Sequence, residues 1–187
     1  KSVSLQQLNG ASREEFVSAL RPLFNNETWP LELAWESRPF GDVNELRAAI
    51  QVAVLTADDS RRAALIHDYP AMDALLLADA DEAATISADR GSLGLTDLDD
   101  VQTERITELS AAYRERFDMP FVAYLDTNDT VDRVIDAGVR RLANSPEQEY
   151  RTALGEIVEI ANDRFDILLA DANPVRSSWD RKFTEVD

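Results

Sequence analysis

The sequence of 187 residues contains no cysteine and a single histidine, His67. The absence of cysteine excludes disulfide bonds, cysteine-ligated zinc or iron–sulfur sites and thiol catalysis. One histidine excludes a metal site built from several histidines of one chain, and we expect no bound metal. No apolar run approaches the roughly 20 residues that span a bilayer, and no signal peptide is recognisable, so we expect a cytoplasmic protein that does not enter membranes.

Basic residues are scarce relative to acidic ones. The chain has 36 Asp and Glu against 19 Lys and Arg, which gives a formal net charge of −17, and Lys1 and Lys182 are its only lysines. This charge disfavours binding to nucleic acids and to anionic lipid surfaces, because both are polyanions that an acidic surface repels. Two explanations of the acidity stay open, namely compositional bias with a solubilising surface and adaptation to high salt.

Helix start signals recur along the chain and are followed by apolar residues at helical spacing. One segment, Phe121–Leu125, has the pattern of a short extended run, and Asp79–Gly94 has the small, acidic and weakly periodic composition of a long loop. These patterns predict an all-α, single-domain bundle of about eight helices over residues 1–170, followed by a polar tail over 171–187. The expected N-caps are Ser12, Thr28, Asp42, Thr96 and Ser145, and further helices are expected over about 60–66, 71–78 and 130–142.

Arg164 is the most informative charged residue, because its helical neighbours are apolar. Residues Ile157, Ile160, Ala161 and Leu168 lie at spacings of seven, four, three and four from it, so they share its helix face. A cation on an apolar face needs an anionic partner. That partner is either an internal carboxylate or a carboxylate of a small anionic substrate, which the planar guanidinium can bind with two parallel hydrogen bonds.

His67 lies at the end of an expected helix, and imidazole is the side chain that titrates nearest neutrality. It can therefore act as an acid or base, or it can simply be a cation at a helix C-terminus. Asp89 and Arg90 lie in the expected loop beside Gly91, where they form either a solvated pair or the edge of a pocket. The sequence has no glycine-rich phosphate loop, no Ser-His-Asp order and no metal-ligand spacing.

A set of short motifs resembles the OHCU decarboxylases, which act on 2-oxo-4-hydroxy-4-carboxy-5-ureidoimidazoline in urate breakdown. The resemblance covers about residues 5–170 in order and spacing. It implies an all-α fold, a homodimer, and a cofactor-free decarboxylation that yields (S)-allantoin. The motifs are Leu8-Asn9-Gly10-Ala11-Ser12 with Phe16; Ala34-Trp35-Glu36-Ser37-Arg38-Pro39-Phe40; Ala64-Leu65-Ile66 with Pro70; Gly94-Leu95; Leu109 with Ala112-Tyr113; Arg116-Phe117; Pro120-Phe121-Val122; Arg140-Arg141-Leu142-Ala143-Asn144; and Ala153-Leu154-Gly155-Glu156-Ile157, followed by Ile160-Ala161 and Arg164.

The family's catalytic signature is a His-Pro pair, a Glu-Gln pair about twenty residues later, and an arginine on the final helix. Arg164 fits the last position. The family's histidine falls on Tyr69, next to Pro70, and its Glu-Gln pair falls on Asp89 and Arg90. The resemblance implies proton transfer at the substrate hydroxyl by the histidine and binding of the ring or ureido edge by the Glu-Gln pair. The expected catalytic residues are therefore His67, Tyr69 and Asp89, and the expected substrate-binding residues are Pro70, Arg90 and Arg164.

These departures from the family pattern have chemical consequences. Tyrosine, with an ordinary pKa near 10, is a poor base at neutral pH but can donate a hydrogen bond. Aspartate is one methylene shorter than glutamate, and arginine replaces a neutral amide by a fixed cation. Three interpretations follow: a decarboxylase with an altered site, an enzyme for a different small anion held by Arg90 and Arg164, and a non-catalytic binding or structural domain.

Overall fold

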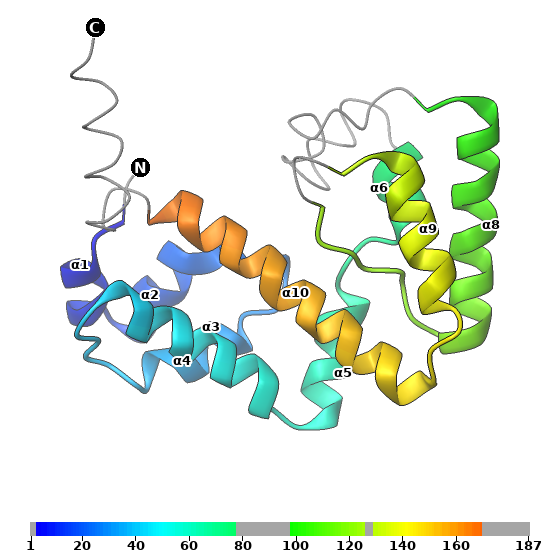
Figure 1. Ribbon diagram of the computed structural model, residues 1–187. Coiled ribbons are helices and arrows are strands. Elements are labelled where there is room, and N and C mark those ends of the chain that lie inside the picture. The colour runs from blue at the N-terminus through cyan, green and yellow to red at the C-terminus, as the bar shows by residue number, and fades with distance from the viewer. Residues whose placement is uncertain (1–2, 78–97, 126–128, 170–187) are drawn as a thin grey trace, which may run out of the picture. The chain divides into compact units, whose positions relative to one another are not determined.

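The computed structural model describes residues 3–77, 98–125 and 129–169, which form helices joined by turns and contain no β-strand (Figure 1). The prediction of an all-α fold is confirmed. The chain divides into two compact units, the first made of Lys1–Arg62 with Val158–Asp187 and the second of Ala63–Ile157. The predicted long loop over residues 79–94 and the predicted tail after residue 170 lie outside the described residues, so the proposed domain boundary stays a prediction.

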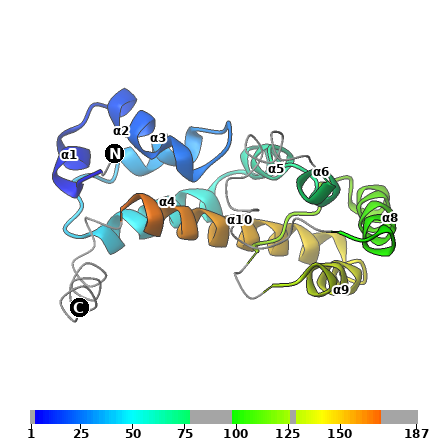
Figure 2. The same cartoon turned by 90° about the horizontal axis from the view of Figure 1, so that it is seen from above.

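The first unit is built on two long helices. In both views α4 lies beside the C-terminal part of α10, and two side-chain pairs link them (Figure 2). Gln51 donates from Nε2 to Oδ1 of Asn162 at 2.9 Å, and Arg47 pairs with Asp166 at 2.5 Å. The helices of this unit are α1 (Leu5–Gly10), α2 (Arg13–Leu20), the 3-10 turn η1 (Arg21–Leu23), α3 (Trp29–Trp35), α4 (Val43–Thr56), the start of α5 (Asp59–His67) and the end of α10 (Pro146–Leu168).

Two of the sequence motifs meet at one corner of this unit. The side chain of Asn9 donates to the carbonyl of Phe40 at 3.0 Å and accepts from its amide at 2.8 Å. The guanidinium of Arg38 donates to the carbonyl of Ala11 at 2.6 Å and lies 4.1 Å from the ring centroid of Trp35. These contacts satisfy backbone groups between α1 and α4 that no helix can satisfy. The two motifs therefore connect the start of the chain to the segment before α4 within the first unit.

The second unit contains the end of α5, α6 (Met72–Leu77), α8 (Asp100–Phe117), α9 (Val131–Arg141) and the start of α10. Helices α8 and α9 pack against each other, and the rings of Tyr113 and Phe121 meet edge-on, with 5.4 Å between their centroids. The segment Phe121–Leu125, expected to be extended, forms no strand in the described part of the chain. Side chains satisfy its backbone instead, since Arg141 donates to the Val122 carbonyl and Glu156 accepts from the Tyr124 amide.

Most of the predicted helix starts are confirmed by hydrogen bonds. Ser12, Asp42, Thr130 and Ser145 each accept from the backbone amide three residues later. Thr28 occupies the N-cap position of α3 but makes no side-chain cap bond, because its backbone is already helical. The prediction of Thr96 as the cap of α8 is wrong, since that cap is Asp99, whose carboxylate accepts from Gln102 at 2.7 Å.

Candidate functional site

Arg164 lies on the C-terminal part of α10, within the first unit. Its side chain is half-buried. The helix neighbours Ile157 and Ala161 are buried, while Ile160 and Leu168 are half-buried. The spacing argument therefore placed Arg164 on the correct helix face, at the edge of the apolar stripe.

The guanidinium of Arg164 is held by neutral acceptors. Its Nη1 donates to Oδ1 of Asn25 at 3.2 Å and to the carbonyl oxygen of Leu23 at 3.4 Å. Among the described residues no carboxylate forms an ion pair with Arg164, whereas Arg47 of the same unit is paired with Asp166. The internal ion pair considered for Arg164 is thus not found in the described part of the chain. A half-buried guanidinium that no described carboxylate compensates is a suitable binding group for a carboxylate of a ligand.

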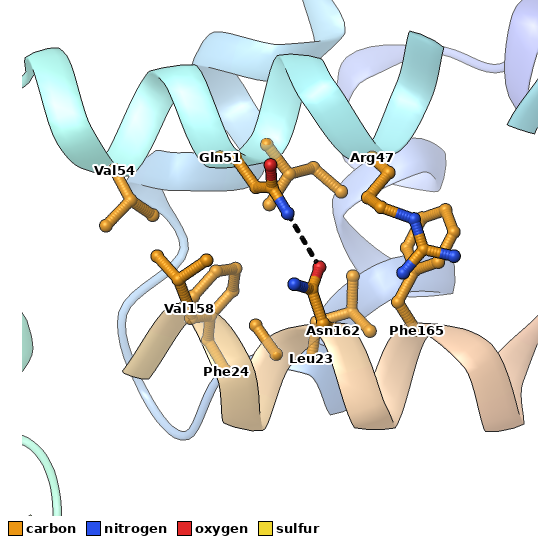
Figure 3. A pocket seen from close by; sticks show the side chains of 10 residues that line it. Leu23, Phe24, Arg47, Gln51, Val54, Val158, Asn162 and Phe165 are labelled. Carbon is orange, nitrogen blue, oxygen red and sulfur yellow. Dashed lines mark hydrogen bonds between the residues drawn. The ribbon is translucent and has the colours of Figure 1, made fainter. Parts of the chain in front are cut away.

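A small cavity lies between α4 and α10 (Figure 3). Its lining includes Gln51 and Asn162, whose hydrogen bond crosses it, together with Phe24 and Phe165. The cavity volume is about 10 Å³, enough for about one water molecule. This cavity is a packing gap between two helices and is too small for a ring-sized substrate.

The residues that follow α5 belong to the second unit. His67 is the last residue of this helix and its side chain is exposed. The helix ends in a turn, in which the Tyr69 amide donates to the Ile66 carbonyl at 3.2 Å. The side chain of Tyr69 is 6% exposed, and Pro70 is half-buried. Tyr69 is therefore fixed against the protein interior, whereas His67 is exposed at the C-terminal end of α5.

The predicted site residues are thus only partly accounted for. His67, Tyr69 and Pro70 lie within four residues of one another in the second unit, and Arg164 belongs to the first unit. Asp89 and Arg90 lie outside the described residues. A single pocket that contains these groups stays a prediction.

A buried polar cluster in the second unit was not recognised as a unit in the sequence. The carboxylate of Glu149 is fully buried and accepts from the Tyr113 hydroxyl at 2.6 Å, from Arg141 Nε at 2.6 Å and from Asn144 Nδ2 at 2.9 Å. Burial, and next the hydrogen bond to Glu149, raise the pKa of the Tyr113 hydroxyl well above its usual range. Both Glu149 oxygens are engaged, so the cluster stabilises the fold and offers no acceptor to a substrate.

Two kinds of structural feature are absent from the described residues. No three Asp, Glu or His side chains of the described ranges gather closely enough to hold a metal ion. None of the helices that the structure describes is long and apolar enough to cross a membrane.

Comparison with known sequences gives one consistent result. The family model described as OHCU decarboxylase matches residues 9–166. The 2-oxo-4-hydroxy-4-carboxy-5-ureidoimidazoline decarboxylase of Haloferax volcanii is 37% identical over 164 residues, which cover 87% of this chain and 94% of that protein. The decarboxylase of the same description from Mus musculus is 32% identical over 181 residues, which cover 93% and 98% of the two chains.

Comparison with solved structures shows the same fold. The crystal structure of (S)-allantoin synthase matches with a TM-score of 0.67 and 23% identity, over 87% of this chain and 53% of that chain. This chain therefore spans about half of the synthase. The crystal structure of OHCU decarboxylase in the presence of (S)-allantoin matches with a TM-score of 0.64 and 13% identity, over 86% and 99% of the two chains.

Proposed function

This chain belongs to the OHCU decarboxylase family, and we propose that it converts 2-oxo-4-hydroxy-4-carboxy-5-ureidoimidazoline into (S)-allantoin and carbon dioxide during urate breakdown. The observation that carries this proposal is the match of the family model to residues 9–166, which include parts of both compact units. Relatives of the same description are similar over most of their own length as well as of this chain.

The reaction needs two kinds of group from the protein. The bond between ring carbon 4 and the carboxylate breaks, carbon dioxide leaves, and the electron pair stays with the ring. The hydroxyl on carbon 4 loses its proton and becomes a carbonyl, while carbon 5 and the ring nitrogen that is double-bonded to it in the substrate each gain a proton. One proton is therefore taken up from solvent overall, which balances the charge of the carboxylate that leaves as carbon dioxide. The site must therefore bind an anion and handle protons, and we propose that it does so without a cofactor.

We assign anion binding to Arg164. Its guanidinium carries a charge that no described carboxylate neutralises, and its Nε and Nη2 donate to no other described residue. Because the substrate carboxylate is converted into neutral carbon dioxide, a cation bound to it stabilises the bound substrate more than the later stages of the reaction. We therefore expect Arg164 to act mainly on KM.

We assign the proton-handling position to Tyr69, with His67 as the alternative. Tyr69 occupies the place of the family's histidine next to Pro70 and has a buried side chain, whereas His67 is exposed. A tyrosine there donates a hydrogen bond to the substrate hydroxyl more readily than it removes a proton. Asp89 and Arg90 complete the proposal as the groups that bind the ring or ureido edge. The presence of Tyr69 also keeps open a second function, a divergent homologue that binds a small anion without decarboxylating it.

The test is to generate the substrate in situ from urate with the two enzymes that precede this step, and to follow optically active allantoin by circular dichroism. We expect the wild-type chain to accelerate its formation and Arg164→Leu to raise KM strongly. Arg151→Leu, on an exposed position of the same helix, is the matched control. If only a Tyr69→His, Asp89→Glu, Arg90→Gln variant is active, the natural chain is the divergent homologue. If neither chain is active, the proposed reaction is wrong.

We also propose that the protein acts in the cytoplasm as a homodimer and binds neither nucleic acid nor membranes. The net charge of −17 supports the last two points, because it repels polyanions. Size-exclusion chromatography with light scattering tests the dimer, and a mass of one chain would contradict it.

A further inference from the structure

Arg164 is hydrogen-bonded to a neutral amide, that of Asn25, at a position where a carboxylate would neutralise its charge. The two residues are 139 positions apart in sequence, yet Oδ1 of Asn25 accepts from Nη1 of Arg164 at 3.2 Å. The second acceptor, the carbonyl oxygen of Leu23, is neutral as well. Both bonds use the same guanidinium nitrogen, so within the described ranges Nε and Nη2 donate to no other residue and form the other edge of the planar group.

The neutrality of this acceptor is notable in so acidic a chain, which has 36 acidic against 19 basic residues. Elsewhere in the same unit, Arg47 pairs with Asp166 and Arg62 pairs with Asp59. A carboxylate at position 25 would form a similar ion pair and occupy Arg164 permanently. A neutral amide fixes the orientation of a long, flexible side chain, and no carboxylate in the described part of the chain compensates its charge.

We propose that Asn25 is a positioning residue for the carboxylate-binding arginine. Its amide oxygen fixes Nη1, so that Nε and Nη2 face the substrate carboxylate, and its lack of charge preserves the affinity of Arg164 for that carboxylate. This inference rests on the proposed function, because the anion in question is the carboxylate of the decarboxylase substrate.

Two variants of Asn25 distinguish the proposed role from a purely structural one, because the two roles predict opposite orders for the loss of substrate affinity. Asn25→Asp keeps the size and the acceptor and adds a negative charge, whereas Asn25→Ala removes the acceptor and adds no charge. If the only role of Asn25 is to link the segment after η1 to α10 by its hydrogen bond with Arg164, the Asp variant retains this bond and the Ala variant loses it. If Asn25 positions an uncompensated cation, the Asp variant is the more damaging one for substrate affinity, because its carboxylate competes with that of the substrate.

The experiment measures KM and kcat of the full-length chain in the urate-coupled assay, together with product inhibition by added (S)-allantoin. We expect Asn25→Asp to raise KM by about five- to tenfold with little change in kcat, and Asn25→Ala to raise KM by a smaller factor. Inhibition by (S)-allantoin is expected to stay unchanged in Asn25→Asp, because that product has no carboxylate. Asn26→Asp is the matched control, since it adds the same charge one position further along the chain, whereas the hydrogen bonds of Arg164 Nη1 go to Asn25 and Leu23.

Three results would overturn the role of Asn25 while leaving the proposed reaction intact. These are an unchanged KM in Asn25→Asp, a larger KM effect in Asn25→Ala than in Asn25→Asp, and an equal effect in Asn26→Asp. An inactive wild-type chain would instead overturn the proposed reaction, and the role of Asn25 with it. Thermal unfolding of each variant identifies any change in KM that arises from a loss of structure.

Discussion

The guanidinium of Arg141 donates to the buried carboxylate of Glu149, with 2.6 Å between Nε and Oε1. Glu149 is 0% exposed and Arg141 is 9% exposed. The same guanidinium donates from Nη1 to the Val122 carbonyl at 2.7 Å, so the pair ties α9 and α10 to the irregular segment Phe121–Leu125. Charges removed from water in this way are stable only while both partners remain.

Replacement of Glu149 by Gln should therefore destabilise the protein strongly. The variant leaves the buried Arg141 without an anionic partner, and we expect the free energy of unfolding to fall by about 3–5 kcal/mol. Urea unfolding followed by circular dichroism measures this change. The control is Asp136→Asn, which removes one of the two exposed carboxylate partners of Arg105 and should cost less than about 1 kcal/mol. Equal effects of the two variants would contradict the structural role of the cluster.

Two helical glycines should respond in opposite directions to substitution by alanine. A Cβ on Gly138 would lie 2.5 Å from Cδ2 of Leu109 and 3.0 Å from Cζ of Phe121, so Gly138→Ala should lower the free energy of unfolding by about 1–3 kcal/mol. A Cβ on Gly155 meets nothing within 4 Å, so Gly155→Ala should raise it by about 0.5–1 kcal/mol through helix propensity. The same urea titration compares both. Stabilisation by Gly138→Ala would show that α8 and α9 are packed less tightly than described.

The proton-handling position can be tested by restoring the imidazole. We expect Tyr69→His to raise kcat by about tenfold or more, because a histidine is a far better base than tyrosine at neutral pH. The control is His67→Ala, which alters an exposed side chain at the end of α5 and should leave kcat within about twofold. Both are measured in the urate-coupled assay. A large loss of kcat in His67→Ala, with normal folding, would instead assign the proton transfer to His67.

The acidic composition predicts a stability that depends on salt. A net charge of −17 makes like charges repel within the compact state, and salt shortens the Debye length from about 10 Å at 0.1 M to about 3 Å at 1 M. We expect Tm to rise by about 5 °C or more between 0.1 and 1 M KCl. Scanning calorimetry measures the shift, with an equal osmolarity of sorbitol as the uncharged control. A Tm that is independent of KCl would leave compositional bias as the explanation of the acidity.

Local features of the fold could be predicted from the sequence because they depend on neighbouring residues. Ser145 and Gln148 form their reciprocal cap at the start of α10 as the pattern indicated, with bonds of 3.1 and 3.2 Å. The cap of α8 was misassigned because Thr96 and Asp99 are both good N-cap residues. Asp99 is the observed cap because Gln102 completes a capping box with it: the Gln102 amide donates to the Asp99 carboxylate, and the Gln102 side chain accepts from the Asp99 amide.

The candidate site could be predicted only in part. The helical spacing of apolar residues placed Arg164 on the correct face of α10, because that face is a property of one helix. The hydrogen-bond partner of Arg164 could not be predicted from helical spacing. Asn25 lies in a turn 139 residues earlier, and no local sequence pattern relates the two positions. The burial of Glu149 could not be predicted for the same reason. The groups that donate hydrogen bonds to its carboxylate come from α8, from α9 and from the turn that follows α9.

The sequence by itself determined the helical class, most helix ends and the family, because each depends on short-range periodicity, on capping or on motifs that can be compared residue by residue. Only the tertiary structure decided that Arg164 is held by neutral oxygens and that Arg141, Glu149 and Tyr113 share one buried network. Whether a charge is paired, and with what, depends on the burial and hydrogen bonds that distant segments provide when they pack together.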